Sequence, residues 1–191
     1  GKNVFYDAND KLGLSKIAYR FIAGIIEHAK GMTDITNPLV NSYKRLVPGF
    51  EAPVYIAWSG KNRSPLIRIP ASKGGGQRIE LRSPDSAANP YLAIAVCLAA
   101  GMDGIRNRIM PPAPVDANIF NLSEEERNKL GIECLPENLM EAIQWLEKDP
   151  VILDTLGEHL SKNYIQARKR EWKEYCSSVT DWETESYLAK I

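Results

Sequence analysis

The sequence has few cysteines, only two histidines and no long apolar run. The cysteines at positions 97, 134 and 176 are widely spaced, so they form neither a metal-binding motif nor a disulfide framework, which favours a reducing, cytoplasmic setting. No stretch of about 18 apolar residues is available to cross a bilayer. Residues 1–7 do not have the pattern of a signal peptide. We therefore expect a cytoplasmic protein with no membrane partner.

Net charge is also absent, because 24 Lys and Arg residues balance 24 Asp and Glu residues. A neutral chain lacks the field of a general polyanion binder, so no nucleic-acid partner is expected. The charges are nevertheless sorted: residues 44–82 hold eight bases against two acids, and residues 116–149 hold nine acids against three bases. Since 44% of the 191 residues are hydrophobic, the chain can bury a globular core. The basic region is the candidate functional region.

Apolar residues repeat at helical spacing over residues 14–29, which predicts a helix with one buried stripe. Ser15 is the expected N-cap and Gly31 the expected C-terminal stop. We expect His28, near the end of this helix, to be partly exposed. A ligand role is disfavoured because no second metal ligand lies at a useful spacing.

The remaining pattern predicts an α+β fold, an antiparallel sheet packed with helices and followed by a helical C-terminal region. Short β-type runs separated by turn signals predict strands over 54–58, 66–69 and 78–82. A helix opening at Asn89-Pro90 is apolar nearly all round, which predicts that it is buried. Ser123–Glu126 has the pattern of a capping box. Later helices are expected at 137–148, 150–156 and 158–177, and the Pro-rich residues 110–118 are a candidate junction.

The run 78–82 alternates strictly between charged and apolar residues. In a strand, this places Arg78, Glu80 and Arg82 on one face and the two apolar side chains on the other. The apolar face must pack on a core, so the charged face is either solvated or a binding site. The pattern alone leaves both interpretations open.

Further arginines in the same region favour a binding site. Arg68 alternates with two isoleucines on a neighbouring strand, and Arg45 and Arg63 lie beside turns. Guanidinium groups bind carboxylate and phosphate through two parallel hydrogen bonds and stay charged at any physiological pH. A carboxylate among them, Glu80, suits a divalent cation that bridges protein and phosphate oxygens. These residues predict an anion site, for phosphate with a divalent metal ion.

Several motifs make the chain resemble the glutamine synthetase family, most closely its bacterial type I enzymes. They occur in family order at nearly family spacing, and the resemblance runs from about Asn3 to the end of the chain. The longest motif is the run 41–53, Asn-Ser-Tyr-Lys-Arg-Leu-Val-Pro-Gly-Phe-Glu-Ala-Pro, and shorter ones lie at 62–64, 68–70, 78–85 and 89–92. Taken alone, the stretch 48–53 is either a mobile loop with one acid or a plain surface turn.

The resemblance implies ATP-dependent ligation of ammonia to L-glutamate through γ-glutamyl phosphate, with Mg²⁺ or Mn²⁺, in a cytoplasmic homododecamer. Glu80 matches a metal ligand, and Arg45 and Arg82 match arginines that hold the substrate glutamate. Arg63 matches the arginine near the transferred phosphoryl group, which contacts ATP and glutamate. The remaining matches are Arg68 and Arg78 to ATP contacts, and Glu51 to an acid that shields the acyl phosphate and takes a proton from the ammonia adduct.

The chain departs from the family in three ways. Residues 1–191 match only the C-terminal portion of one catalytic domain; the small N-terminal domain, the other metal carboxylates and the metal-binding histidine have no counterpart, so we expect these residues alone to be inactive. The glycine tip 74–76 stands where many relatives have a lysine near ATP, and Lys73 is the candidate substitute. Phe120 stands where an adenylylated subtype has tyrosine, so that modification is not expected there.

Three alternative functions stay open at this point. The chain could belong to a γ-glutamyl ligase for another amine, which would keep the arginines for ATP and glutamate. It could belong to a non-catalytic regulatory protein with the same fold, although that hypothesis predicts the loss of Glu51 or Glu80. An RNA-binding module is suggested by the basic region, but aromatic residues are not interleaved with its basic residues.

Overall fold

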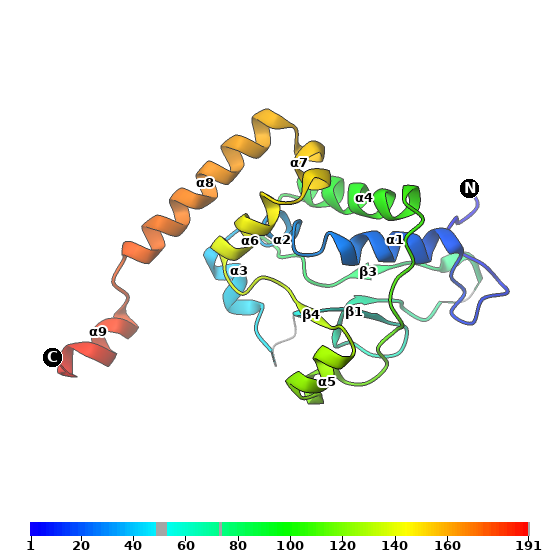
Figure 1. Ribbon diagram of the computed structural model, residues 1–191, viewed down its shortest axis with the longest axis horizontal. Helices are drawn as coiled ribbons and strands as arrows, with labels where there is room; N and C mark the ends of the chain where they lie inside the picture. The colour runs from blue at the N-terminus through cyan, green and yellow to red at the C-terminus, as the bar shows by residue number, and fades with distance from the viewer. Residues whose placement is uncertain (49–52, 73, 191) are drawn as a thin grey trace.

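The computed structural model describes residues 1–48, 53–72 and 74–190 and has an α+β architecture (Figure 1). Its strands are short and its helices are distributed along the whole chain. In chain order the elements are α1 (Lys16–Glu27), α2 (Thr33–Thr36), α3 (Val40–Arg45), β1 (Tyr55–Ser59), β2 (Pro65–Arg68), the 3₁₀ helix η1 (Gly74–Gly76), β3 (Glu80–Leu81), α4 (Pro90–Arg106), η2 (Ile119–Asn121), α5 (Glu124–Lys129), β4 (Glu133–Cys134), α6 (Leu139–Leu146), α7 (Pro150–Leu156), α8 (Glu158–Ser177), α9 (Asp181–Tyr187) and η3 (Leu188–Lys190).

Within the described residues the strands form one sheet of order β3-β2-β1-β4. The pairings of β2 with β3 and of β1 with β4 are antiparallel, as expected, whereas β1 and β2 are parallel. The segment between these two strands runs back along β1 before β2 begins. Asn62 holds that segment by donating to the carbonyl oxygens of Val115 and Ala117, each at 2.9 Å. The sheet is therefore mixed, because a tertiary contact replaces a hairpin turn.

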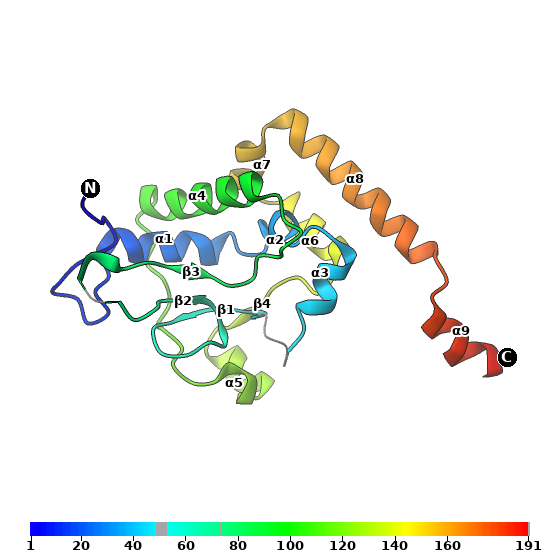
Figure 2. The same ribbon diagram turned by 180° about the vertical axis from the view of Figure 1, so that it is seen from behind.

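Helices α1 and α4 form two layers on one side of the sheet, whereas α5 lies on the other side (Figures 1 and 2). Figures 1 and 2 show α1 between α4 and the sheet, and α1 contacts both α4 and β1. The two helices approach closely because glycines face each other: a Cβ on Gly104 would lie 2.5 Å from the Gly24 amide nitrogen and would overlap the Arg20 carbonyl oxygen. Such a contact is possible only without side chains, so these glycines set the distance between the layers.

The helix starts that the sequence predicts are confirmed. Ser15 caps α1 by accepting from the Ala18 amide, and Asn89 caps α4 with Pro90 at its first position. Ser123 and Glu126 form the capping box of α5. The α1 helix nevertheless ends at Glu27, before Gly31 is reached. Local capping chemistry thus fixes where helices begin more closely than where they end.

The expectation that the helix after Asn89 is buried on all sides is wrong. Tyr91, Ile94 and Leu98 are 85%, 68% and 55% exposed, while Val96 and Ala100 are fully buried. The reason is that α1, α7 and α2 pack against only part of α4. The Pro-rich segment 110–118 lies along β1, where the Trp58 indole donates to the Pro112 carbonyl oxygen at 2.8 Å.

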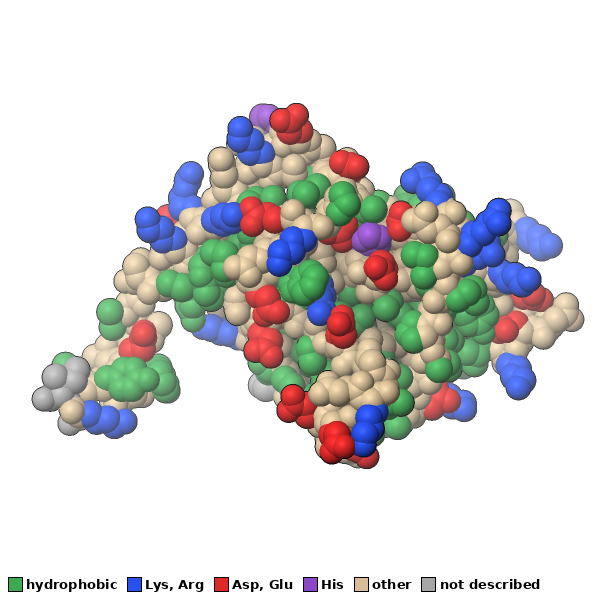
Figure 3. All heavy atoms as spheres, viewed as in Figure 1, with side chains coloured by type: hydrophobic (Ala, Val, Ile, Leu, Met, Phe, Trp, Pro, Cys, Tyr) green, Lys and Arg blue, Asp and Glu red, His purple; other side chains and the backbone are tan. Residues whose placement is uncertain are grey.

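The C-terminal helices extend away from the sheet. Helix α8 packs against α6, α7 and α3, and α9 lies beyond it, far from the sheet in both views (Figures 1 and 2). Hydrophobic side chains gather on the surface of α9 (Figure 3), where Trp182 is 64% and Tyr187 is 50% exposed. Among the described residues, no helix has the length and apolar character needed to span a membrane.

Candidate functional site

The centre of the candidate site is a cross-strand pair on β2 and β3. Arg68 and Glu80 are directly opposite each other in the antiparallel register. Their charged groups form an ion pair, with 3.4 Å between Arg68 Nη2 and Glu80 Oε2. Arg82 Nε lies 3.7 Å from the other carboxylate oxygen. The predicted alternation is therefore observed for Glu80 and Arg82, with one carboxylate between two guanidinium groups.

The apolar side of the same strand explains this orientation. Ile79 and Leu81 are partly buried against the core, and Ile67 and Ile69 on the neighbouring strand are buried. Because side chains alternate along a strand, burying these residues turns the charged ones to the opposite face. The core thus orients the site.

Two further segments are tied to this group through backbone carbonyl groups. Arg82 Nη1 donates to the Arg63 carbonyl oxygen, which ties β3 to the segment before β2. Arg45, at the end of α3, donates from Nη2 to the Ser83 carbonyl oxygen and to Asn37 Oδ1, the latter at 3.0 Å. Arg45 is therefore held beside the residue that follows Arg82.

Arg45, Arg68 and Arg82, the arginine group around Glu80, include two hydrogen-bond donors without an acceptor among the described residues. The Nε atoms of Arg45 and Arg68 are buried, and no described residue accepts a hydrogen bond from either. A buried, charged donor without an acceptor is costly, and an anion with several oxygens supplies acceptors. This region therefore suits phosphate or carboxylate better than a neutral ligand.

One acid next to Arg45 stays ionised despite partial burial. Burial raises the pKa of Asp85, but the hydrogen bond from the Ala87 amide and the nearby Arg45 charge outweigh it and hold the pKa below its ordinary value. The Asp85 amide also donates to the Thr36 carbonyl oxygen at 2.8 Å. This segment therefore links β3 to the residues that precede α3.

Not every predicted site residue joins the group. Arg78 is exposed and precedes β3. In the part of the chain that the structure describes, the ion pairs of Glu80 are with Arg68 and Arg82 and not with Arg78. Arg63 is also exposed and contributes its carbonyl oxygen rather than its guanidinium group. Glu51 and Lys73 lie outside the described residues.

A divalent metal fits this site only in part. Across residues 1–48, 53–72 and 74–190, no three His, Cys, Asp or Glu side chains are close enough together to hold a metal ion. Glu80 can supply one carboxylate, which is the oxygen ligand that Mg²⁺ and Mn²⁺ prefer. A complete metal site needs ligands beyond those described here.

Sequence reasoning missed the partners that orient Arg45. Asn37 is completely buried, and in the sequence it is recognisable only as part of the turn signal Asn37-Pro38. The Ser83 acceptor is a backbone carbonyl, which every residue type carries. Neither partner therefore leaves a signal in the sequence.

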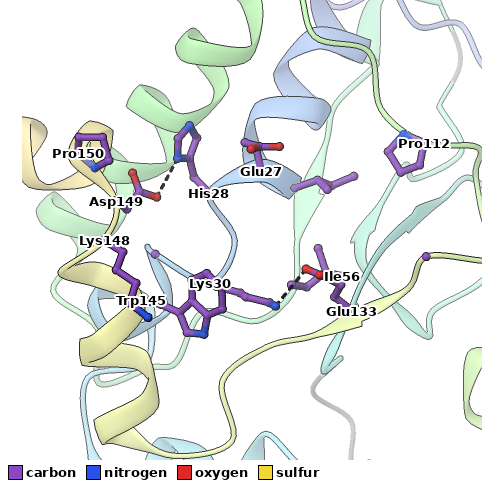
Figure 4. Close-up of a pocket in the computed structure, with 13 residues that line it drawn as sticks. Glu27, His28, Lys30, Ile56, Pro112, Glu133, Trp145, Lys148, Asp149 and Pro150 are labelled. Atoms are coloured by element: carbon purple, nitrogen blue, oxygen red, sulfur yellow. Dashed lines mark hydrogen bonds and ion pairs between the residues drawn. The ribbon is translucent and has the colours of Figure 1, made fainter. Parts of the chain in front are cut away.

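A cavity of about 440 Å³ opens beside the end of α1, away from the arginine group (Figure 4). Lys30 Nζ lies 3.0 Å from Glu133 Oε2 and 4.5 Å from the centre of the Trp145 ring. Lys148 lies over the same ring at 5.4 Å. The cavity wall combines acids and bases that are largely paired with each other, so it lacks the excess of donors that distinguishes the arginine group.

His28, on the wall of this cavity, is buried, contrary to expectation, with 8% of its surface exposed. Its Nδ1 lies 2.8 Å from Asp149 Oδ2, and its Nε2 lies 3.3 Å from Asp103 Oδ2. The other oxygen of Asp149 accepts from the amides of Val151 and Ile152 and so caps α7. The histidine therefore connects the end of α1 to α4 and α7, a contact over 121 residues that local patterns do not contain.

Replacing His28 with glutamine should destabilise the protein more at pH 6 than at pH 8.5. The hydrogen bond to Asp149 raises the pKa of His28, against the lowering effect of burial, and the Asp149 and Asp103 charges raise it further. A raised pKa gives stability that is complete below pH 6.5 and is lost as the pH rises through the folded-state value. Melting temperatures of both proteins across this range provide the measurement.

The control for this change is His159→Gln on the exposed surface of α8. It should leave the melting temperature unchanged at every pH. If the melting temperatures of wild type and His28→Gln differed by the same amount at every pH, that result would contradict an ion pair between protonated His28 and the aspartates.

Comparison with known proteins places the whole chain in one family. A family model described as glutamine synthetase, catalytic domain, matches residues 1–187. The glutamine synthetase of Clostridium saccharobutylicum is 56% identical over 190 residues, which are 100% of this chain and 43% of that protein. The glutamine synthetase of Thermotoga maritima is 55% identical over 187 residues, 98% of this chain and 43% of that protein.

The fold agrees with a solved structure. A structure described as a complex of GmaS with ADP superposes with a TM-score of 0.86 at 40% sequence identity, covering 99% of this chain and 43% of that one. The α+β class expected from the sequence is thereby confirmed. The chain spans less than half the length of the relatives it matches.

Proposed function

This chain belongs to the glutamine synthetase family, and on that premise we propose that it supplies part of an active site that joins ammonia to L-glutamate. ATP phosphorylates the side-chain carboxylate of glutamate, and ammonia displaces phosphate from γ-glutamyl phosphate to give L-glutamine. The observation that carries the proposal is the placement of Glu80 between Arg68 and Arg82, at 3.4 and 3.7 Å. This arrangement supports a site for an acidic amino acid and a polyphosphate.

Different arginines bind different anionic groups of the substrates. Arg82 and Arg45, which donates to the carbonyl oxygen of the residue after Arg82, bind the glutamate. Arg68 and Arg78 bind the phosphates of ATP, and the Arg68 side chain is 27% exposed, so part of it is accessible for this contact. Arg63 neutralises charge that develops on the transferred phosphoryl group. Fixed positive groups at these positions stabilise the transition state because they need no reorganisation.

Two acids complete the proposed chemistry. Glu80 is one ligand of a divalent ion, Mg²⁺ or Mn²⁺, which when bound neutralises charge on the phosphate oxygens. Glu51, outside the described residues, shields the acyl phosphate from water and takes a proton from the ammonia adduct. Excluding water matters because the acyl phosphate hydrolyses readily.

We further propose that residues 1–191 form the C-terminal portion of one catalytic domain in a cytoplasmic homododecamer. Support comes from the length of the relatives, of which this chain matches 43%. The remaining metal ligands then belong to the part of the enzyme that this chain does not span.

The test uses a protein of the relatives' full length that carries this chain. With ATP, L-glutamate and Mg²⁺ or Mn²⁺, it should form glutamine and phosphate in equal amounts when ammonia is added. Parallel reactions with methylamine and with a polyamine identify a ligase for another amine, if either amine is preferred over ammonia. The absence of ATP cleavage with every amine would mean that the protein is a non-catalytic member of the family.

A further inference from the structure

We propose that one face of α8 positions Arg45 for glutamate binding by holding the backbone of residues 34–40, with Arg168 as the central positioning residue. This inference rests on the proposed function, because it takes Arg45 as a substrate-binding group. Arg168 itself does not touch the substrate. It acts through Asn37, which lies within the held segment and accepts a hydrogen bond from Arg45.

Three side chains of α8 contact this segment in register. Tyr164, Arg168 and Glu171 are spaced at i, i+4 and i+7, so they share one face of the helix. The Tyr164 hydroxyl donates to the Asp34 carbonyl oxygen at 2.9 Å, and Arg168 Nη1 donates to the Pro38 carbonyl oxygen at 2.9 Å. Glu171 Oε1 accepts from the Val40 amide at 3.4 Å. The helix thus holds both sides of residue 37.

The guanidinium group of Arg168 is itself fixed by its neighbours. Its Nη1 lies 2.6 Å from Glu171 Oε2, and the group lies over the Tyr164 ring at 5.5 Å. Its side chain is 22% exposed, so solvent screens these contacts only in part. Because an acid and an aromatic ring fix the orientation of this planar group, its hydrogen bond to the Pro38 carbonyl oxygen fixes the position of that backbone.

The buried acid beneath this contact does not compete for Arg168. Asp34 is completely buried, and burial raises its pKa to about 8, although the Arg168 charge opposes the shift. No described residue hydrogen-bonds to its carboxyl oxygens. Burial therefore disfavours the charged form of Asp34, and the guanidinium group of Arg168 contacts Pro38 and Glu171 instead.

Asn37 carries the effect from this segment to the site. Its side chain is fully buried, donates to the Thr36 hydroxyl at 3.0 Å and accepts from Arg45 Nη2 at 3.0 Å. Only one other acceptor, the Ser83 carbonyl oxygen, is found for Arg45 among the described residues. Displacing Asn37 therefore frees the guanidinium group to rotate away from the position that binds glutamate.

The test compares Arg168→Ala, Arg168→Lys and Arg170→Ala in a protein of the relatives' full length. Arg168→Ala should raise the KM for glutamate on the order of tenfold, the effect of one hydrogen bond to a charged group. The kcat and the KM for ATP should change less than twofold, because the lost interaction is the same in the ground and transition states. Arg168→Lys should restore part of the affinity for glutamate, because lysine keeps the positive charge but cannot donate parallel hydrogen bonds from a planar group. Arg170 is exposed on the same helix, so its replacement should have no effect.

A purely structural role for Arg168 would lower the melting temperature without this selective change in KM. If Arg168→Ala does not fold, Tyr164→Phe removes only the hydroxyl contact to Asp34 and should raise the KM for glutamate severalfold. If wild type has no glutamate-dependent turnover, the proposed function fails. If wild type is active and the variants that fold keep the wild-type KM for glutamate, the positioning role alone is wrong.

Discussion

Replacing Glu80 with glutamine should lower glutamine formation by about a hundredfold or more in a protein of the relatives' full length. Glutamine has the shape of glutamate but no charge, so it binds a divalent ion weakly. Charge neutralisation by a metal contributes several kcal/mol to the transition state, and each 1.36 kcal/mol is about a factor of ten in rate. The measurement is the initial rate of glutamine formation as a function of Mg²⁺ or Mn²⁺ concentration.

The fold should survive this change. Glu80 is 37% exposed, and its ion pairs with Arg68 and Arg82 are screened by solvent, so their loss costs at most about 1 kcal/mol. A matched control is Glu133→Gln on β4, which removes another paired acid of the same sheet. The control should keep full activity, and an unchanged metal dependence in Glu80→Gln would remove Glu80 from the metal site.

Replacing Gly104 with alanine should destabilise the protein by about 3 kcal/mol or more. In an exposed helix this change would stabilise by about 1 kcal/mol, but here the new methyl group meets the backbone of α1 at Arg20 and Gly24. Backbone atoms cannot move aside as a flexible side chain can, so the two helices must separate. The melting temperature should fall on the order of 10 °C for a chain of this size.

The control for this prediction is Gly75→Ala. A Cβ at Gly75 meets no atom within 4 Å, so its effect on the melting temperature should be small. Equal melting temperatures for the two variants would mean that α1 and α4 are not in close contact. Circular dichroism of Gly104→Ala at low temperature shows whether the fold is retained before melting.

The sequence contains much of the information for the candidate site because strand alternation is a local property. The pattern of 78–82 already places Glu80 with Arg82, and burial of Ile79 and Leu81 enforces it. Helix starts are equally local, since Ser15 and Asn89 bond to amides within three residues of themselves. For these residues the local rule gives the observed arrangement, whereas Arg78 lies outside β3, which begins at Glu80, so strand alternation does not place it.

The features that could not be predicted depend on contacts between distant segments. Between the parallel strands β1 and β2, Asn62 binds the carbonyl oxygens of residues 115 and 117, and a turn signal encodes neither the parallel pairing nor that contact. The burial of His28 depends on Asp103 and Asp149. The exposed side of α4 could not be predicted either, because composition shows that a helix is apolar but not how many neighbours cover it. Tertiary packing decides such cases.

The contacts of α8 with residues 34–40 end on main-chain atoms, and this has a consequence for which side chains the support requires. A carbonyl oxygen is present whatever side chain a residue carries, so the hydrogen bonds from Tyr164 and Arg168 do not themselves require a particular side chain at position 34 or 38. The contact with Glu171 requires an amide hydrogen at position 40, which proline lacks. The side chains that form this support therefore belong to α8, and within the held segment the side chain that the positioning of Arg45 requires is that of Asn37.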